Sequence, residues 1–169
     1  DKCFLSAKDQ GEKNTYKIYE IKKLPNQIWG EPNLISAIDL KGNNIAPFFH
    51  KASNTLYFSS DSKQGMGGYD LYKTTYNSAA KTWTAPENLG YPVNSPYDES
   101  SISLNKQGNK AFISSIRPGG FGNYDIYQLD FLDKEVKRAV FIVETYNKNK
   151  QKKIVNTEIE IFNNHDVLI

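Results

Sequence analysis

Carboxylates are the groups in this sequence whose type and spacing could carry chemistry. Asp98 and Glu99 are adjacent, and a pair of carboxylates is what a glycosidase needs as its acid and base. Asp70 and Asp125 each lie between a tyrosine and an aliphatic residue, where a carboxylate either binds a ligand or accepts internal hydrogen bonds. Because Asp70 and Asp125 stand at an offset of 55 in two similar segments, we expect a structural role, with serine hydroxyls and loop N–H groups as donors.

Histidine and cysteine are too few to indicate a catalytic centre. His50 and His165 are far apart and form no Ser-His-Asp or Cys-His pattern, and segment 77–83 lacks the aspartate and glycine of a sialidase Asp-box. The single cysteine, Cys3, excludes an internal disulfide, and we expect it to be a small buried residue in a strand. We therefore expect no enzymatic activity and assign no catalytic residue.

Two glycine-rich segments, 65–68 and 119–122, resemble phosphate cradles or calcium loops at first sight. A phosphate cradle leads into a helix N-terminus, whereas a strand is predicted after each of these segments. The contiguous short repeats of a calcium-binding β-roll are missing. We expect hairpin loops whose glycines permit tight turns, with no metal and no cofactor, and keep an ion in these loops as the alternative.

The elements that position these residues repeat along the chain. Residues 33–72 align without a gap on residues 88–127, with 11 of the 40 positions identical. A weaker copy precedes them, in which residues 3–19 align on residues 56–72. The positions that recur are expected to be structural: Ser59, Ser60, Tyr69, Asp70, Tyr72, Trp83, Ser114, Ser115, Tyr124, Asp125 and Tyr127.

Each copy predicts short strands, which in the middle copy cover residues 44–50, 54–60, 69–76 and 84–89. In the last copy, residues 105–108 predict a hairpin turn in which Gly108 has a positive φ. Consecutive apolar residues, as in Leu56-Tyr57-Phe58 and Ala111-Phe112-Ile113, predict sheets covered on both faces. Repeated four-stranded sheets of this kind are typical of propeller blades. The expected fold class is all-β, a partial β-propeller of two to three four-stranded blades followed by the start of a small β-sandwich.

The expected domain boundaries follow the repeat. Residues 1–132 form the propeller part, with a partial blade over 1–34, a full blade over 35–89 and a partial blade over 90–132. The pattern changes in residues 133–169, where strands over 139–146 and 157–162 predict the start of a carboxypeptidase-regulatory-like β-sandwich or, alternatively, a closing hairpin. Because a propeller needs more blades, we expect further chain, or as the alternative a second copy, to complete the ring.

Net charge and hydropathy limit the classes of binding partner that we expect. Lys and Arg exceed Asp and Glu by 21 to 19, so no global field favours nucleic acid, and the lysines of segment 148–153 are expected to solvate a turn. No apolar run is long enough to insert into a membrane. The loop 116–123 is the candidate partner-binding loop, with Arg117, Pro118 and Phe121 as an expected cationic and aromatic surface.

A family resemblance covers residues 3–131. The segments LYFSS, YDLY, WTAPENLG, FISS and GGFGNYDIY resemble the WD40-like, TolB-type (PD40) repeat, in the version found in OmpA-type multidomain proteins of type IX secretion and gliding. The first copy departs from the pattern, because Lys17 replaces the aspartate and the glycines are missing.

The resemblance implies a non-enzymatic protein-protein interaction scaffold in the periplasm, associated with the outer membrane and serving a secretion or motility assembly. The implied partners are proteins of that envelope assembly. Peptidoglycan would be bound only through a domain absent from these residues. The alternative is a carbohydrate-binding or glycan-processing propeller, in which exposed tyrosines and tryptophans would stack on sugars.

Overall fold

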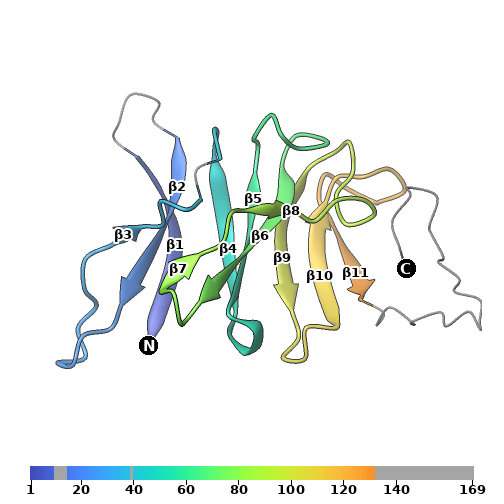
Figure 1. The fold of residues 1–169 in the computed structure, drawn as a ribbon. Coiled ribbons are helices and arrows are strands. Elements are labelled where there is room, and N and C mark those ends of the chain that lie inside the picture. Colours follow the sequence, from blue (N-terminus) through green and yellow to red (C-terminus); the bar gives the residue numbers. More distant parts are fainter. Residues whose placement is uncertain (10–14, 39, 132–169) are drawn as a thin grey trace, which may run out of the picture. The chain divides into compact units, whose positions relative to one another are not determined.

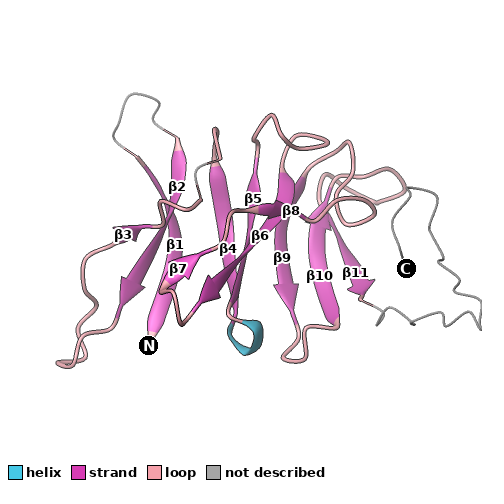
Figure 2. Cartoon of the chain, viewed as in Figure 1, coloured by secondary structure: helices cyan, strands magenta, loops and turns pink. Residues whose placement is uncertain are grey.

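The computed structural model describes residues 1–9, 15–38 and 40–131 as an all-β assembly of three antiparallel sheets (Figures 1 and 2). The chain divides into two units, Asp1–Asp133 and Lys134–Ile169. The expected strands over 139–146 and 157–162, His165 and the lysine-rich segment 148–153 lie outside the described residues, as does the loop 10–14 of the first copy. None of the helices among the described residues is long and apolar enough to cross a membrane.

The first sheet has the strand order β1-β2-β3, with β1 at Lys2–Lys8, β2 at Tyr16–Lys22 and β3 at Asn33–Leu34. The second sheet runs β4-β5-β6, with β4 at Asn44–His50, β5 at Thr55–Ser60 and β6 at Asp70–Asn77. Both β7 (Thr82–Trp83) and β8 (Glu87–Asn88) pair with β6, and the 3-10 turn η1 (Lys51–Ser53) connects β4 to β5. The third sheet has the order β11-β10-β9, with β9 at Glu99–Leu104, β10 at Lys110–Ser115 and β11 at Asp125–Asp130.

The three sheets repeat one pattern of pairing. At the offset of 55, β4, β5 and β6 of the second sheet correspond to β9, β10 and β11 of the third. The predicted strands 44–50, 54–60 and 69–76 agree with β4, β5 and β6 to within one residue at each end. Of the predicted strand 84–89, only the short β8 at Glu87–Asn88 forms, and β7 at Thr82–Trp83 lies just before it. Gly108 has the predicted positive φ, 76°, and its N–H donates to Asn105 O at 3.0 Å.

The second sheet is covered on both faces, as the consecutive apolar residues predicted. Leu56 and Phe58 point to the first sheet, where they pack with Ile18 of β2 in one hydrophobic cluster. Leu71 points the other way and packs with Ile113 of β10 in a second cluster. Because successive residues of a strand point to opposite faces, only two covering sheets can bury such neighbours together.

The outer two sheets differ from this pattern. Phe112 is 52% exposed, although Ala111 and Ile113 on either side of it are buried. Cys3 lies in a strand as predicted, but the prediction that it is buried is wrong, because its side chain is exposed. Both residues lie on the face of their sheet that no described sheet covers.

Candidate interaction surface

Asp70 and Asp125 each hold one glycine-rich loop. Asp70 Oδ2 accepts the backbone N–H groups of Met66 and Gly67, at 2.7 and 3.2 Å. Asp125 Oδ2 accepts the corresponding two N–H groups of segment 119–122, at 2.8 and 3.2 Å. The predicted loop N–H donors are confirmed. A helix follows neither loop, so the described structure offers neither of them the helix N-terminus that a phosphate cradle uses.

The predicted serine donors are wrong for both aspartates in the described structure. Ser59 Oγ donates instead to Glu99 O at 2.6 Å, and Asp70 Oδ1 has no hydrogen-bond partner among the described residues. Asp70 is completely buried, and this burial raises the pKa of its carboxyl against the opposing effect of the two loop N–H groups. A Cβ added at Gly65 would collide with this carboxylate, which explains why glycine stands there.

Asp98 joins the second sheet to the third. Its Oδ1 accepts the Tyr69 N–H at 2.9 Å, and its Oδ2 accepts the Tyr124 hydroxyl at 3.2 Å. Asn43 holds the corresponding position one repeat earlier, and its Oδ1 accepts the Tyr16 N–H at 3.1 Å. Partial burial and then the charge of Asp98 raise the pKa of the Tyr124 hydroxyl. The recurrence of this contact shows that the repeat includes the junction between neighbouring sheets.

Glu99 is completely buried beside this junction. Its carboxylate accepts the Ser95 N–H and hydroxyl at 2.9 and 2.6 Å, the Ser115 hydroxyl at 2.8 Å and Arg117 Nη2 at 2.9 Å. The adjacent Asp98 has its own internal partners. The two carboxylates are therefore bound in separate structural networks, and the geometry does not present them as an acid and base pair to a common cavity.

Arg117 lies inside this network, where sequence reasoning expected an exposed cation. Its guanidinium donates to the backbone oxygens of Val93 and Pro92 at 2.7 and 3.3 Å, as well as to Glu99. It also lies over the Tyr127 ring, 5.2 Å from the ring centroid, and only 20% of the side chain is exposed. The sequence did not indicate the ion pair between Arg117 and Glu99, because the two residues are 18 positions apart along the chain.

Pro118 and Phe121 are exposed as expected, and Phe121 is 104% exposed. Other exposed large side chains occupy neighbouring connections that follow β5, β8 and β10 at one end of the sheets (Figure 1). We call this set the aromatic loop surface; it comprises Met66, Tyr91, Tyr97, Phe121 and Tyr124. A cavity of about 490 Å³ lies within it, lined by Tyr97, Asp98, Ile116, Gly122, Asn123 and Tyr124.

The remaining recurring positions lie mainly in strands. Ser60 accepts the Ser62 N–H, Tyr72 stacks on Phe58, and Trp83 packs on Phe4 and Phe49 across the first two sheets. Tyr127 donates its hydroxyl to Arg117 O at 3.3 Å. Ser114 lies on the open face of the third sheet with Ile126.

His50 has a contact that the sequence did not indicate. It is buried, its Nε2 lies 3.1 and 3.0 Å from the carbonyl oxygens of Asn105 and Lys106, and its Nδ1 lies 2.8 Å from Ser53 Oγ. Two carbonyls at Nε2 require that this nitrogen carry a proton. His50 therefore connects the second sheet to the hairpin of the third.

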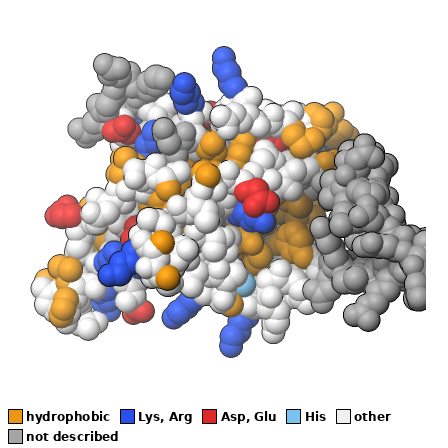
Figure 3. Space-filling view, in the orientation of Figure 1, with side chains coloured by type: hydrophobic (Ala, Val, Ile, Leu, Met, Phe, Trp, Pro, Cys, Tyr) orange, Lys and Arg blue, Asp and Glu red, His pale blue; other side chains and the backbone are white. Residues whose placement is uncertain are grey.

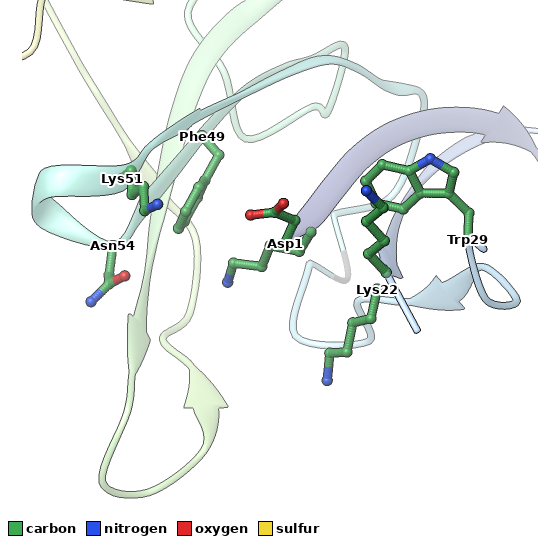
Figure 4. A pocket seen from close by; sticks show the side chains of 8 residues that line it. Asp1, Lys22, Trp29, Phe49, Lys51 and Asn54 are labelled. Carbon is green, nitrogen blue, oxygen red and sulfur yellow. The ribbon is translucent and has the colours of Figure 1, made fainter. Parts of the chain in front are cut away.

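A second cavity, of about 810 Å³, is lined by residues at the start of β1 and the ends of β2 and β4, the other end of the strands in Figure 1. Figure 4 shows it from close by. Trp29 and Lys22 stand on one side of it, Phe49, Lys51 and Asn54 on the other, and Asp1 lies between them (Figure 4). Lys2 and Lys23 complete the lining. Lys2 and Lys22 pair with Glu20, at 3.4 and 3.6 Å. Elsewhere on the face seen in Figure 3, lysine and arginine side chains are dispersed.

Metal-ligating side chains do not gather in the part of the chain that the structure describes: no group of three or more His, Cys, Asp or Glu is placed to hold an ion there. The chain matches no protein-family model, and no curated protein matches it significantly.

Proposed function

We propose that this chain is a segment of a β-propeller that serves as a non-enzymatic protein-protein interaction scaffold, with the aromatic loop surface as its binding face. The observation that carries the proposal is that exposed aromatic rings stand on loops whose backbone is held by hydrogen bonds. Phe121 is 104% exposed, yet its own N–H is bound to Asp125 at 2.8 Å. An aromatic side chain on a loop that is already ordered loses little conformational entropy when it binds, which is typical of interaction hot spots.

The repeated junction between sheets supports the propeller part of the proposal. Asn43 and Asp98 make the same contact at successive junctions, and the middle sheet is buried on both faces. Blades packed face to face around an axis have this arrangement. The sequence resemblance to PD40 repeats of OmpA-type proteins leads us to place the protein in the periplasm near the outer membrane, with partners in a secretion or motility assembly.

Partner capture from an envelope extract tests the binding face. The variant Phe121→Ser/Tyr97→Ser should lose the captured proteins, whereas Ile28→Ser, which alters an exposed apolar residue in another turn, should keep them. Both variants should melt as the parent does, because the substituted side chains are exposed. Equal capture by the two variants would show that the aromatic loop surface is not the binding face.

The second candidate function is carbohydrate binding, and the lysine-lined cavity is the observation that favours it. Trp29 is 49% exposed at this cavity and could stack on a sugar ring, while the lysines could bind acidic substituents. A glycan array with acidic and neutral sugars, run beside the capture experiment, separates the two functions. Glycan binding that is lost in Trp29→Ala, with no captured protein, would favour carbohydrate binding over the protein-protein interaction scaffold.

A further inference from the structure

Three polar side chains form a row across the second sheet, next to the glycine-rich loop 65–68. Asn44, Ser60 and Asp70 are register partners on β4, β5 and β6, so their side chains share one face of the sheet. We call them the polar row; all three residues are completely buried. Asn44 Oδ1 and Asp70 Oδ1 have no hydrogen-bond partner among the described residues. A buried acceptor without a partner is costly, so the polar row requires a donor or a cation.

The third sheet has a cation on the corresponding row. The register partners there are Glu99, Ser115 and Asp125. The Arg117 guanidinium lies on this row, because Nη2 donates to Glu99 at 2.9 Å and Nε donates to Ser115 Oγ at 3.1 Å. At the offset of 55 the counterpart of Arg117 is Ser62, which has a short side chain without charge. The second sheet therefore repeats the row of oxygens but replaces the cation by a neutral residue.

We propose that the polar row binds one hard metal cation, Na⁺ or Ca²⁺, in the place that the Arg117 guanidinium takes in the third sheet. Carboxylate, amide and hydroxyl oxygens are the ligands that such ions prefer. Asp70 Oδ1 supplies the charge, and the side-chain oxygens of Asn44 and Ser60 supply neutral ligands. Because the polar row has a single carboxylate, a monovalent ion balances its charge, whereas Ca²⁺ leaves one positive charge over.

A proton is the alternative way to neutralise Asp70. Burial raises the pKa of this carboxyl, and the charges of Glu99 and Asp98 act in the same direction, against the N–H groups of Met66 and Gly67. A metal ion instead keeps the carboxylate ionised, since an opposite charge favours the charged form. The two states respond differently to salt, because a specific cation stabilises only the fold that binds it.

The ion would also hold one loop of the aromatic loop surface. Asp70 uses its other oxygen, Oδ2, for the N–H groups of Met66 and Gly67, so the ion and the loop bind two different oxygens of one carboxylate. Binding of the ion thus fixes the anchor of the loop that carries the exposed Met66. The inference goes beyond the proposed function, because it concerns a site inside the second sheet and not the partner bound by the loops.

Thermal unfolding of the 169-residue chain in three salts tests this inference. The metal-free protein is melted in choline chloride, NaCl and CaCl₂ at equal ionic strength. We expect the melting temperature to rise with the concentration of Na⁺ or Ca²⁺ above its value in choline chloride, and the effective ion identifies the charge that the site accepts. The same melting temperature in all three salts would overturn the proposal, because a protonated Asp70 does not distinguish these cations.

Variants of the polar row locate the ion. Asn44→Glu/Ser62→Arg copies the ion pair of the third sheet, and Asp70→Asn keeps an oxygen for the loop while replacing the carboxylate by a neutral amide. Both should lose the response to Na⁺ or Ca²⁺, whereas Glu87→Gln, which removes a carboxylate from a side chain that is 69% exposed, should respond as the parent does. A response that persists in Asp70→Asn would place the ion elsewhere and refute the proposal, even if the double variant does not fold.

Discussion

Replacing Arg117 by methionine tests whether this residue stabilises the fold or serves a partner. The substitution keeps most of the apolar stem but removes the guanidinium that lies 2.9 Å from the buried Glu99 carboxylate. Removing one member of a buried ion pair costs about 3–5 kcal/mol in general. Glu99 keeps three other donors and Arg117 is 20% exposed, so we expect the free energy of unfolding to fall by about 2–3 kcal/mol.

Urea denaturation followed by far-UV circular dichroism measures this change. Lys110→Met is the control, because Lys110 pairs with Asp130 across an exposed part of the sheet, with 56% and 48% of the side chains exposed. An exposed pair contributes at most about 1 kcal/mol. In a double-mutant cycle, Glu99→Gln combined with Arg117→Met should lower the free energy of unfolding by less than the sum of the two single changes. The reason is that Arg117→Met alone leaves the Glu99 charge unpaired, whereas the double variant has no charge there.

The result that would refute this reasoning is a free energy of unfolding for Arg117→Met within error of that for Lys110→Met. The guanidinium would then contribute no more than a surface cation. If partner capture were lost at the same time, Arg117 would belong to the binding face, as the sequence first indicated.

Three further predictions concern the aspartates and their loops. Asp125→Ala should lower the free energy of unfolding by about 1 kcal/mol and Asp70→Ala by about 2–3, because the loop hydrogen bonds of Asp70 are partly buried and those of Asp125 are exposed. Unchanged melting of Asp125→Ala with lost partner capture would contradict its structural role. Gly120→Ala should cost about 1–3 kcal/mol, since its Cβ would meet the Asp125 carboxylate, whereas Gly122→Ala has open space and should be neutral; equal thermal shifts would contradict this difference. A raised pKa means that folding favours protonated Asp70, so the contribution of this carboxyl to stability is lost as the pH rises from about 3.9 through the raised value. Over that window the free energy of unfolding of the parent should fall relative to that of Asp70→Asn. A constant or opposite difference between the two in urea titrations would be contrary evidence.

Local sequence determined the strands and loops well. The repeat at an offset of 55 predicted β4, β5 and β6 to within one residue, because alternation, aromatic content and turn residues act over a few neighbours. The loop N–H groups bound by Asp70 and Asp125 were also predictable, since donor and acceptor are three or four residues apart.

Contacts between sheets were not predictable in the same way. His50 reaches the carbonyl of Asn105, 55 residues away, and Glu99 meets Arg117 across 18 residues. Nothing in the neighbouring residues distinguishes the buried Glu99 from the loop-binding Asp98 beside it. Only the packing of the third sheet against the second assigns each carboxylate its partners.

The sequence by itself determined that the chain repeats, that it is all-β, and that Asp70 and Asp125 bind the glycine-rich loops that precede them. The tertiary structure decided which carboxylates and cations are bound by other groups of the protein and which apolar residues stay exposed. The physical reason is that periodicity in a strand specifies which side chains share a face, whereas the neighbouring sheet decides whether that face is buried. Arg117 and Ile126 show both outcomes: the expected surface cation is inside, and the counterpart of a core residue is 77% exposed.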